Sequence, residues 1–298
     1  MKKVLLFLAL VCLVGFCLNA DALDLVFHQV YKIQPGMSVD EIMQVSEHVQ
    51  YTLFADDYQS TGNVLYVEKT GATRTRKFLR QRIVLGPDSQ SPEYRYKDLI
   101  MFTQPTSVKG LGILSWSYVD ADRDQDQWLW LPSLKKVRKV SAAQGDDSFM
   151  GSDFTTEEIT TRRYEDETYT LLGEEKFKGF TSEHDNQTYY AGRDCYKIEC
   201  KPKRDPWYYS KRITWVDKEF GSTIYDEVYD SKGNLYKNIF KRYVVQKVDG
   251  KDYYTQDYLE VKDLRSGHKT LIEMEDIKFD QGLEEDYFSE RTLRRSKW

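Results

Sequence analysis

The fold is decided around LPSLKKVRKVSAAQGDDSFMGSDF, residues 131–154. The chain leaves an apolar segment at Pro132, returns as a basic alternating strand over 135–141, and then crosses a polar connection. The residues that follow, TTEE at 155–158, have the pattern of a helix capping box. Three apolar side chains precede this helix start: Phe149, Met150 and Phe154. The pattern predicts the place where a sheet meets its helical cover.

The same stretch does not have the pattern of a catalytic or phosphate-binding site. Gly151-Ser152-Asp153 lacks the frame of a strained nucleophile turn, and the chain has no glycine-rich phosphate loop. A run of aspartates over 120–126 imitates a calcium loop, but Gln125 and Leu131 stand where glycine and glutamate are required. The four histidines are scattered. We therefore expect no enzyme, no metal site and no cofactor.

Alternating segments rich in Val, Ile, Tyr, Thr, Trp and Phe dominate the chain from about residue 60. Short turns such as Asp249-Gly250 and Ser266-Gly267 join several of them, which indicates an antiparallel meander. We expect an excursion from the sheet over 173–188. The predicted strands are 62–69, 73–85, 94–103, 112–119, 126–131, 135–141, 167–172, 189–201, 211–217, 222–229, 235–248, 253–264 and 268–279.

Few helices accompany these strands. A capping box at 38–41 opens one helix, the segment after Thr155 is a second candidate, and 284–288 is a third. So few helical residues can cover an apolar sheet face without filling it. The fold class is mainly β: an incomplete antiparallel β-barrel, or curved sheet, closed by a helical lid over an apolar cavity. A packed barrel is the alternative that the pattern leaves open.

The N-terminus has the pattern of an export signal. Two lysines precede an apolar run over 4–18, and small residues at 20 and 22 suit a signal peptidase. We expect residues 1–22 to be cleaved and 23–298 to form a single domain. Cys195 and Cys200 lie five residues apart on a predicted strand, which places them on opposite faces and disfavours a disulfide.

Acidic residues exceed basic ones, 48 to 43, which disfavours nucleic acid as a partner. A local basic row nevertheless occurs in the strand at 73–85, where Leu79 and Ile83 occupy the opposite face. We expect this row to point outward, either as a solvated face paired with acidic neighbours or as a docking surface for acidic lipid headgroups or a protein. Its members are Arg74, Arg76, Arg80 and Arg82.

Several blocks together resemble the LolA-like family of periplasmic outer-membrane lipoprotein-sorting proteins, in particular its longer branch, which is often associated with inner-membrane exporters. The most specific block is DQWLWLPSLKKVRKV at 126–140, which runs into SFMGSDF at 148–154. Four further blocks follow in the expected order: 169–174, 209–219, 266–270 and 288–293.

The resemblance implies a carrier in the periplasm that holds acyl chains of a lipoprotein or lipid in an apolar cavity and moves them toward the outer membrane. It implies an inner-membrane exporter and an outer-membrane acceptor as partners. An accessory or sensor subunit of an exporter or envelope pathway is the alternative function. Candidate cavity residues, each of which is otherwise ordinary core, are Ile42, Val49, Ile100, Phe102, Leu129, Leu131, Leu259, Val261, Ile272 and Met274. Phe149, Met150 and Phe154 are the expected lid residues.

Overall fold

A computed structural model describes residues 33–51, 55–86, 89–140 and 145–294. The predicted signal peptide lies outside the described residues. The α-helices are α2 (Val39–Tyr51) and α3 (Glu290–Leu293). The strands are β1 (Asp57–Val67), β2 (Thr73–Val84), β3 (Tyr94–Gln104), β4 (Gly112–Tyr118), β5 (Asp126–Leu131), β6 (Lys136–Val140), β7 (Glu167–Lys176), β8 (Phe180–Thr181), β9 (Thr188–Tyr189), β10 (Asp194–Pro202), β11 (Lys211–Asp217), β12 (Thr223–Tyr229), β13 (Leu235–Val248), β14 (Lys251–Asp263) and β15 (Lys269–Phe279).

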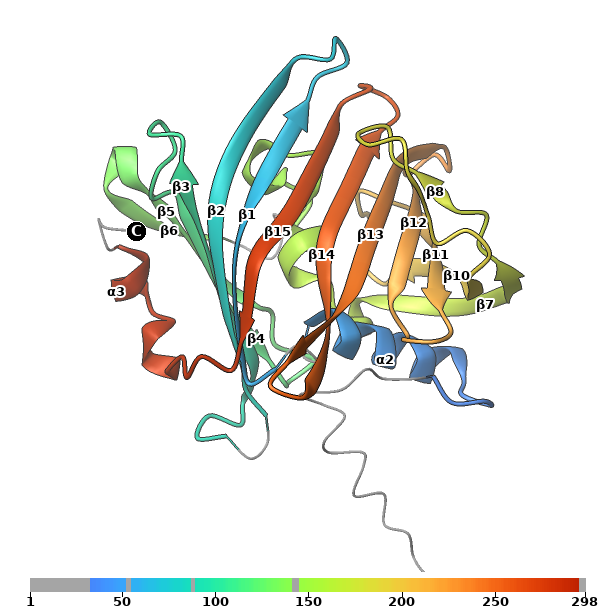
Figure 1. The fold of residues 1–298 in the computed structure, drawn as a ribbon, viewed down its shortest axis with the longest axis horizontal. Coiled ribbons are helices and arrows are strands. Elements are labelled where there is room, and N and C mark those ends of the chain that lie inside the picture. The colour runs from blue at the N-terminus through green and yellow to red at the C-terminus, as the bar shows by residue number, and fades with distance from the viewer. Residues whose placement is uncertain (1–32, 52–54, 87–88, 141–144, 295–298) are drawn as a thin grey trace, which may run out of the picture.

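Thirteen of these strands form one antiparallel sheet in the order β6-β5-β4-β3-β2-β1-β15-β14-β13-β12-β11-β10-β7. Neighbours in the sheet are mostly neighbours in sequence, as a meander requires, and the β1–β15 pair joins the two halves. The sheet is strongly curved (Figure 1). It is not closed into a barrel, because β6 and β7 remain its two edges.

The concave face of the sheet carries the largest apolar cluster. Direct cross-strand partners such as Phe78 and Phe102, or Leu259 and Ile272, point to the same side and meet there. The segment 145–166 lies inside the curve, and its Phe149 and Phe154 are buried in the cluster. The helix predicted after Thr155 forms as a single π-helical turn, Glu157–Thr161, between the short 3₁₀ helices Phe149–Gly151 and Tyr164–Asp166.

Two segments cover the convex face. The C-terminal chain packs Phe288 and Leu293 against Leu99, Met101 and Leu114 of β3 and β4. The excursion expected over 173–188 begins only after β7 ends at Lys176, and it carries the small β8–β9 hairpin. Aromatic rings from this hairpin stack on β13, where Phe180 and Phe240 have ring centroids 4.4 Å apart. Both faces of the sheet are therefore buried over much of its area.

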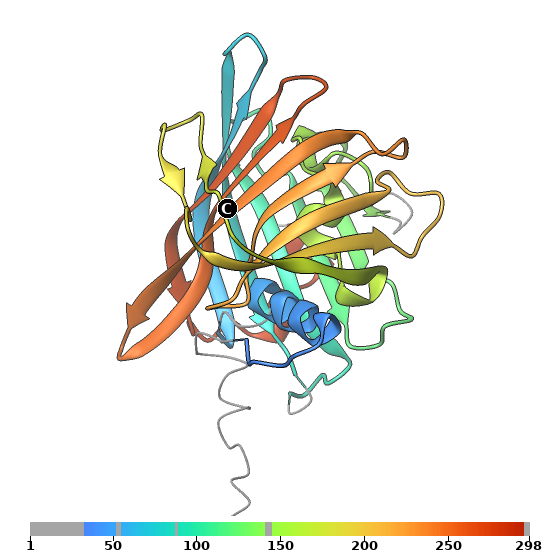
Figure 2. The ribbon, with the colours of Figure 1, turned by 90° about the vertical axis from the view of Figure 1, so that its right-hand side faces the viewer.

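Helix α2 lies across one end of the sheet (Figure 2). The predicted capping box is present: Ser38 N donates to Glu41 Oε2 at 2.7 Å, and Glu41 N donates to Ser38 Oγ at 3.3 Å. The helix buries Ile42 against Cys200, whereas Cys195 packs among aromatic residues on the other face. The two thiols are free, as the spacing predicted. No described helix has the length and apolarity that a membrane crossing requires.

Candidate ligand-binding site

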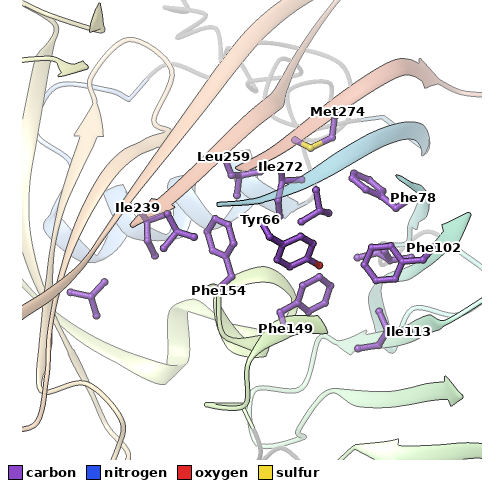
Figure 3. Close-up of a cluster of buried hydrophobic side chains, with 14 of the residues drawn as sticks. Tyr66, Phe78, Phe102, Ile113, Phe149, Phe154, Ile239, Leu259, Ile272 and Met274 are labelled. Carbon is purple, nitrogen blue, oxygen red and sulfur yellow. The ribbon is translucent and has the colours of Figure 1, made fainter. Parts of the chain in front are cut away.

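An inner cavity lies between the concave face and the segment 145–166. Its volume is about 50 Å³, much less than the roughly 300 Å³ at which ligand pockets begin. The side chains that converge there from β1, β2, β3, β14, β15 and the segment nearly fill the space (Figure 3). Its lining includes Val64, Phe78, Ile100, Phe102, Phe149, Ile159, Leu259, Ile272 and Met274. The segment itself therefore occupies the apolar interior.

Met150 connects the segment to the sheet through its backbone. Its φ of 52° is left-handed, a conformation that a residue other than glycine adopts at some cost. The carbonyl oxygen of Met150 accepts hydrogen bonds from Arg76 Nη1 at 2.7 Å and from the Tyr66 hydroxyl at 3.2 Å. The Arg76 guanidinium also lies 5.4 Å from the centre of the Phe102 ring. These bonds hold the segment that carries Phe149 against β1 and β2.

A capping box starts the next turn of the segment, as the TTEE motif predicted. Thr155 N donates to Glu158 Oε2 at 2.8 Å, and Glu158 N donates to Thr155 Oγ1 at 3.2 Å. The same carboxylate is ion-paired with Lys237 of β13 at 2.9 Å, and both side chains are buried. Burial opposes ionisation of Glu158, but Lys237 and its other partners hold its pKa below the ordinary value.

A second buried ion-pair network lies deeper on the concave face. Arg212 of β11 binds Glu167 at 2.7 Å and Asp226 at 2.8 Å, and Asp226 also pairs with Lys241 at 3.1 Å. Burial would raise the pKa of Glu167, yet Arg212 keeps it below the ordinary value. This network was not predicted from the sequence. Its available signal was the alternation of Lys237 and Lys241 with the apolar Ile239 on one face of β13.

Six of the ten predicted cavity residues come together in the concave cluster: Ile100, Phe102, Leu259, Val261, Ile272 and Met274. Leu129 and Leu131 share that face, since Leu129 pairs with Ile113, but they are only half-buried. Ile42 and Val49 do not line the inner cavity; they pack α2 onto the other half of the sheet. Phe149 lines the cavity, and Phe154 lies in the same cluster. Ligand binding by these residues stays a prediction.

The expected outward direction of the arginine row on β2 is wrong. Arg80 pairs across the sheet with Ile100 and Arg82 with Asp98, which places the row on the concave face. Both arginines line the inner cavity, and the Arg82 side chain is only 1% exposed. The opposite face, which carries Leu79 and Ile83, is not the concave interior: Leu79 pairs with Met101 of the cluster on the convex side. Ile83 instead packs beneath the C-terminal segment.

A wider outer groove of about 860 Å³ opens between α2, the ends of β2 and β3, and residues 280–283. Its apolar wall contains Val84, Leu85 and Tyr96, and Tyr51 separates it from the inner cavity because this ring lines both. Charged groups also border the groove. Arg95 binds Glu47 at 3.0 Å and Glu165 at 2.7 Å. Burial raises the pKa of Glu47 to about 7, although Arg95 acts in the opposite direction.

A large curved antiparallel sheet that is not closed into a barrel is consistent with a LolA-like fold. A domain from Vibrio parahaemolyticus described as an outer membrane lipoprotein-sorting protein is 26% identical with a TM-score of 0.70, and the match covers 86% of this chain and 98% of that one. A DUF1329 family protein from Desulfovibrio piger ATCC 29098 is 28% identical with a TM-score of 0.68, over 85% and 95% of the two chains. A LolA superfamily protein from Nitrosomonas europaea shares the fold, at 17% identity and a TM-score of 0.60 over 86% and 100%.

A family model described only as an uncharacterized protein matches residues 95–295. Comparison with curated proteins gives no match. The chain belongs to the family that this model describes, and the similarity to the three solved structures supports a LolA-like family.

Proposed function

We propose that this protein is a periplasmic carrier that binds the acyl chains of a lipid or lipoprotein against the concave face of its sheet. The observation that carries the proposal is the apolar concave face, which Phe149 and Phe154 of the segment 145–166 cover. Phe149 and Phe154 already lie where an acyl chain would find apolar walls. When the segment 145–166 moves away, that surface would become available to a chain.

Energetics favour such an exchange. An acyl chain gains about 0.8 kcal/mol for each methylene group that it buries. When the segment moves away, the concave face loses its apolar contacts with Phe149 and Phe154, and contacts with the acyl chain would replace them. Cargo and segment would thus compete for one surface, and the segment acts as the lid that the sequence predicted. The outer groove, which is separated from the inner cavity by Tyr51, offers a route for a chain to approach.

The similarity to a lipoprotein-sorting domain supports this function. We further propose that residues 1–22 direct export and are removed, so that the carrier is the single domain 23–298. N-terminal sequencing of the exported protein would test the cleavage site after Ala22. A mature protein that retained Met1 would contradict it.

The decisive experiment is native mass spectrometry of the protein purified from its own periplasm, followed by lipid extraction. We expect an acyl-containing species to accompany the protein. Absence of any such species, together with failure to bind a fluorescent fatty-acid probe, would overturn the carrier function. A stoichiometric complex with an inner-membrane protein and no lipid would favour the accessory or sensor alternative.

The lid role is tested by Phe149→Asp and Phe154→Asp. A carboxylate at either position opposes burial in the apolar cluster. We expect impaired uptake of the fluorescent probe while circular dichroism shows the sheet still folded. Uptake equal to that of the unmodified protein would contradict the lid role.

A further inference from the structure

The arginine row of β2 runs along the concave face from the rim of the sheet toward its interior. Alternate residues of a strand are about 6.6 Å apart, so the four steps from Arg74 to Arg82, with Phe78 between Arg76 and Arg80, span roughly 26 Å. Arg74, near the rim, lies 4.4 Å from the centre of the Tyr66 ring. Arg76 follows beside Phe102, and Arg80 and Arg82 line the inner cavity. The row therefore follows the same apolar surface that an acyl chain would contact.

Among the described residues, the four arginines of this row carry more positive charge than the carboxylates paired with them carry negative charge. In the described part of the chain, Asp98 is the one carboxylate that forms ion pairs with these four guanidinium groups, at 2.7 Å from Arg80 and 2.6 Å from Arg82. The other carboxylates near this face already have partners, since Asp153 accepts a hydrogen bond from Thr270 and Glu158 pairs with Lys237.

Arg80 is the member best placed to meet a ligand. Its Nε and Nη2 bind Asp98, while Nη1 has no hydrogen-bond partner among the described residues. The side chain is 16% exposed and lines the inner cavity. A guanidinium group offers five N–H donors and matches carboxylate or phosphate oxygens. Such a group beside apolar walls is suited to a molecule that joins an anion to a hydrocarbon chain.

We propose that the concave arginine row binds the anionic headgroup of the carried lipid, so that the cargo class is an acyl lipid with a carboxylate or phosphate group. The proposal rests on the carrier function above and specifies its ligand. The chain would lie on the concave apolar face in place of Phe149, while the headgroup contacts Arg80.

Three probes with one palmitoyl chain separate headgroup from chain: palmitate, 1-palmitoyl lysophosphatidic acid, and neutral monopalmitoylglycerol. Affinities would be measured by displacement of a fluorescent fatty-acid probe from the delipidated mature protein, with inorganic phosphate as a fourth ligand. We expect at least one anionic lipid to bind about tenfold more tightly than monopalmitoylglycerol, as one charge-assisted hydrogen bond would provide. Palmitate and lysophosphatidic acid distinguish a carboxylate from a phosphate source.

Arg80→Met should remove most of this preference and leave the affinity for monopalmitoylglycerol unchanged. The variant should fold, because Arg82 still neutralises Asp98. The matched control is Lys77→Met, which removes one positive charge from an exposed position on the opposite face of the same strand. If a thermal melt shows that Arg80→Met is unfolded, Arg80→Gln replaces it, because glutamine can still donate a hydrogen bond to Asp98 while it removes the positive charge, and the same loss of preference is expected.

Each result decides the proposal. Equal affinity for the three lipids would overturn the headgroup site and leave the carrier function intact, whereas failure of all three to bind would overturn both. Inorganic phosphate that bound as tightly as lysophosphatidic acid would exclude a lipid-specific site. Equal losses in Lys77→Met and in the arginine variant would assign the preference to overall charge and contradict a role for the row.

Discussion

Glu167 is a buried acidic residue that its hydrogen-bond partners stabilise. It accepts hydrogen bonds from Arg212 Nε at 2.8 Å, Arg212 Nη2 at 2.7 Å and the Tyr209 hydroxyl at 2.9 Å. Loss of one partner from a buried ion pair is costly because it leaves the other charge unpaired in a medium of low polarity. The stability of this region therefore depends on individual residues rather than on the total number of ion pairs.

Glu167→Gln should lower the free energy of unfolding by about 3 to 5 kcal/mol, because Arg212 would lose one of its two carboxylate partners. Chemical denaturation would measure the change. Glu174→Gln is the matched control on the same strand, since its pair with Lys218 is exposed and should contribute about 0 to 1 kcal/mol. Similar losses in the two variants would show that burial does not set the difference.

Arg76→Met should loosen the segment 145–166. The substitution removes the charged donor from the Met150 carbonyl and leaves only the Tyr66 hydroxyl on that oxygen. Loss of one charged hydrogen bond, worth about 1.5 to 3 kcal/mol, predicts roughly tenfold or greater acceleration of amide hydrogen exchange over residues 148–158. Lys77→Met is again the control. Unchanged exchange in Arg76→Met would show that the segment is held by its apolar contacts alone.

Helix α2 carries an acidic residue, Glu47, whose burial opposes its ionisation. Glu47 has a pKa of about 7 in the folded protein, against an ordinary value of 4.5, chiefly because of burial. The folded state thus holds this proton more tightly than the unfolded state does. The resulting contribution to stability is complete below about pH 4.5 and is lost as the pH rises through 7.

Glu47→Gln should remove that loss. Relative to the unmodified protein, we expect the variant to gain about 1 to 3 kcal/mol between pH 5 and pH 8. Urea denaturation at the two pH values would measure the difference. A gain at pH 5 equal to that at pH 8 would indicate that the ion pair with Arg95, and not the proton, governs this position.

The C-terminal segment is an element whose removal should expose one face of the sheet. Phe288 is 1% exposed and packs near Trp116, whose indole N–H donates to the Phe288 carbonyl at 2.9 Å. Phe288→Ala should cost about 3 to 5 kcal/mol and shift tryptophan emission to longer wavelength. Leu264→Ala, at a site 41% exposed, should do neither. An unshifted emission spectrum would show that the segment does not shield these indoles.

The strands could be predicted from the sequence because alternation and turn residues are local signals. The predicted bounds of β5, β11 and β13 agree with the structure. Which face of β2 points to the concave side could not be predicted. Both faces of this strand are covered, and alternation does not distinguish the concave side from the convex side. The helix expected after Thr155 is present as one π-helical turn, Glu157–Thr161, and its capping box forms. Its local signal lies in the residues 155–158, whereas nothing in the sequence states how far the helix continues.

The long sheet is curved around the segment 145–166 and is covered on its convex side by two other segments. The C-terminal chain and the β8–β9 hairpin cover the convex side, so the sheet does not depend on the inner segment alone for its packing. This division explains how the proposed carrier could release the segment 145–166 without unfolding.

The open edges at β6 and β7 have a consequence for capacity. A closed barrel has a girth that its strand number and stagger determine, and its lumen is correspondingly rigid. A sheet with two unjoined borders has no such constraint. Small changes of twist spread over many strands could flatten or tighten it, and the proposed carrier would then fit its inner space to acyl chains of different length.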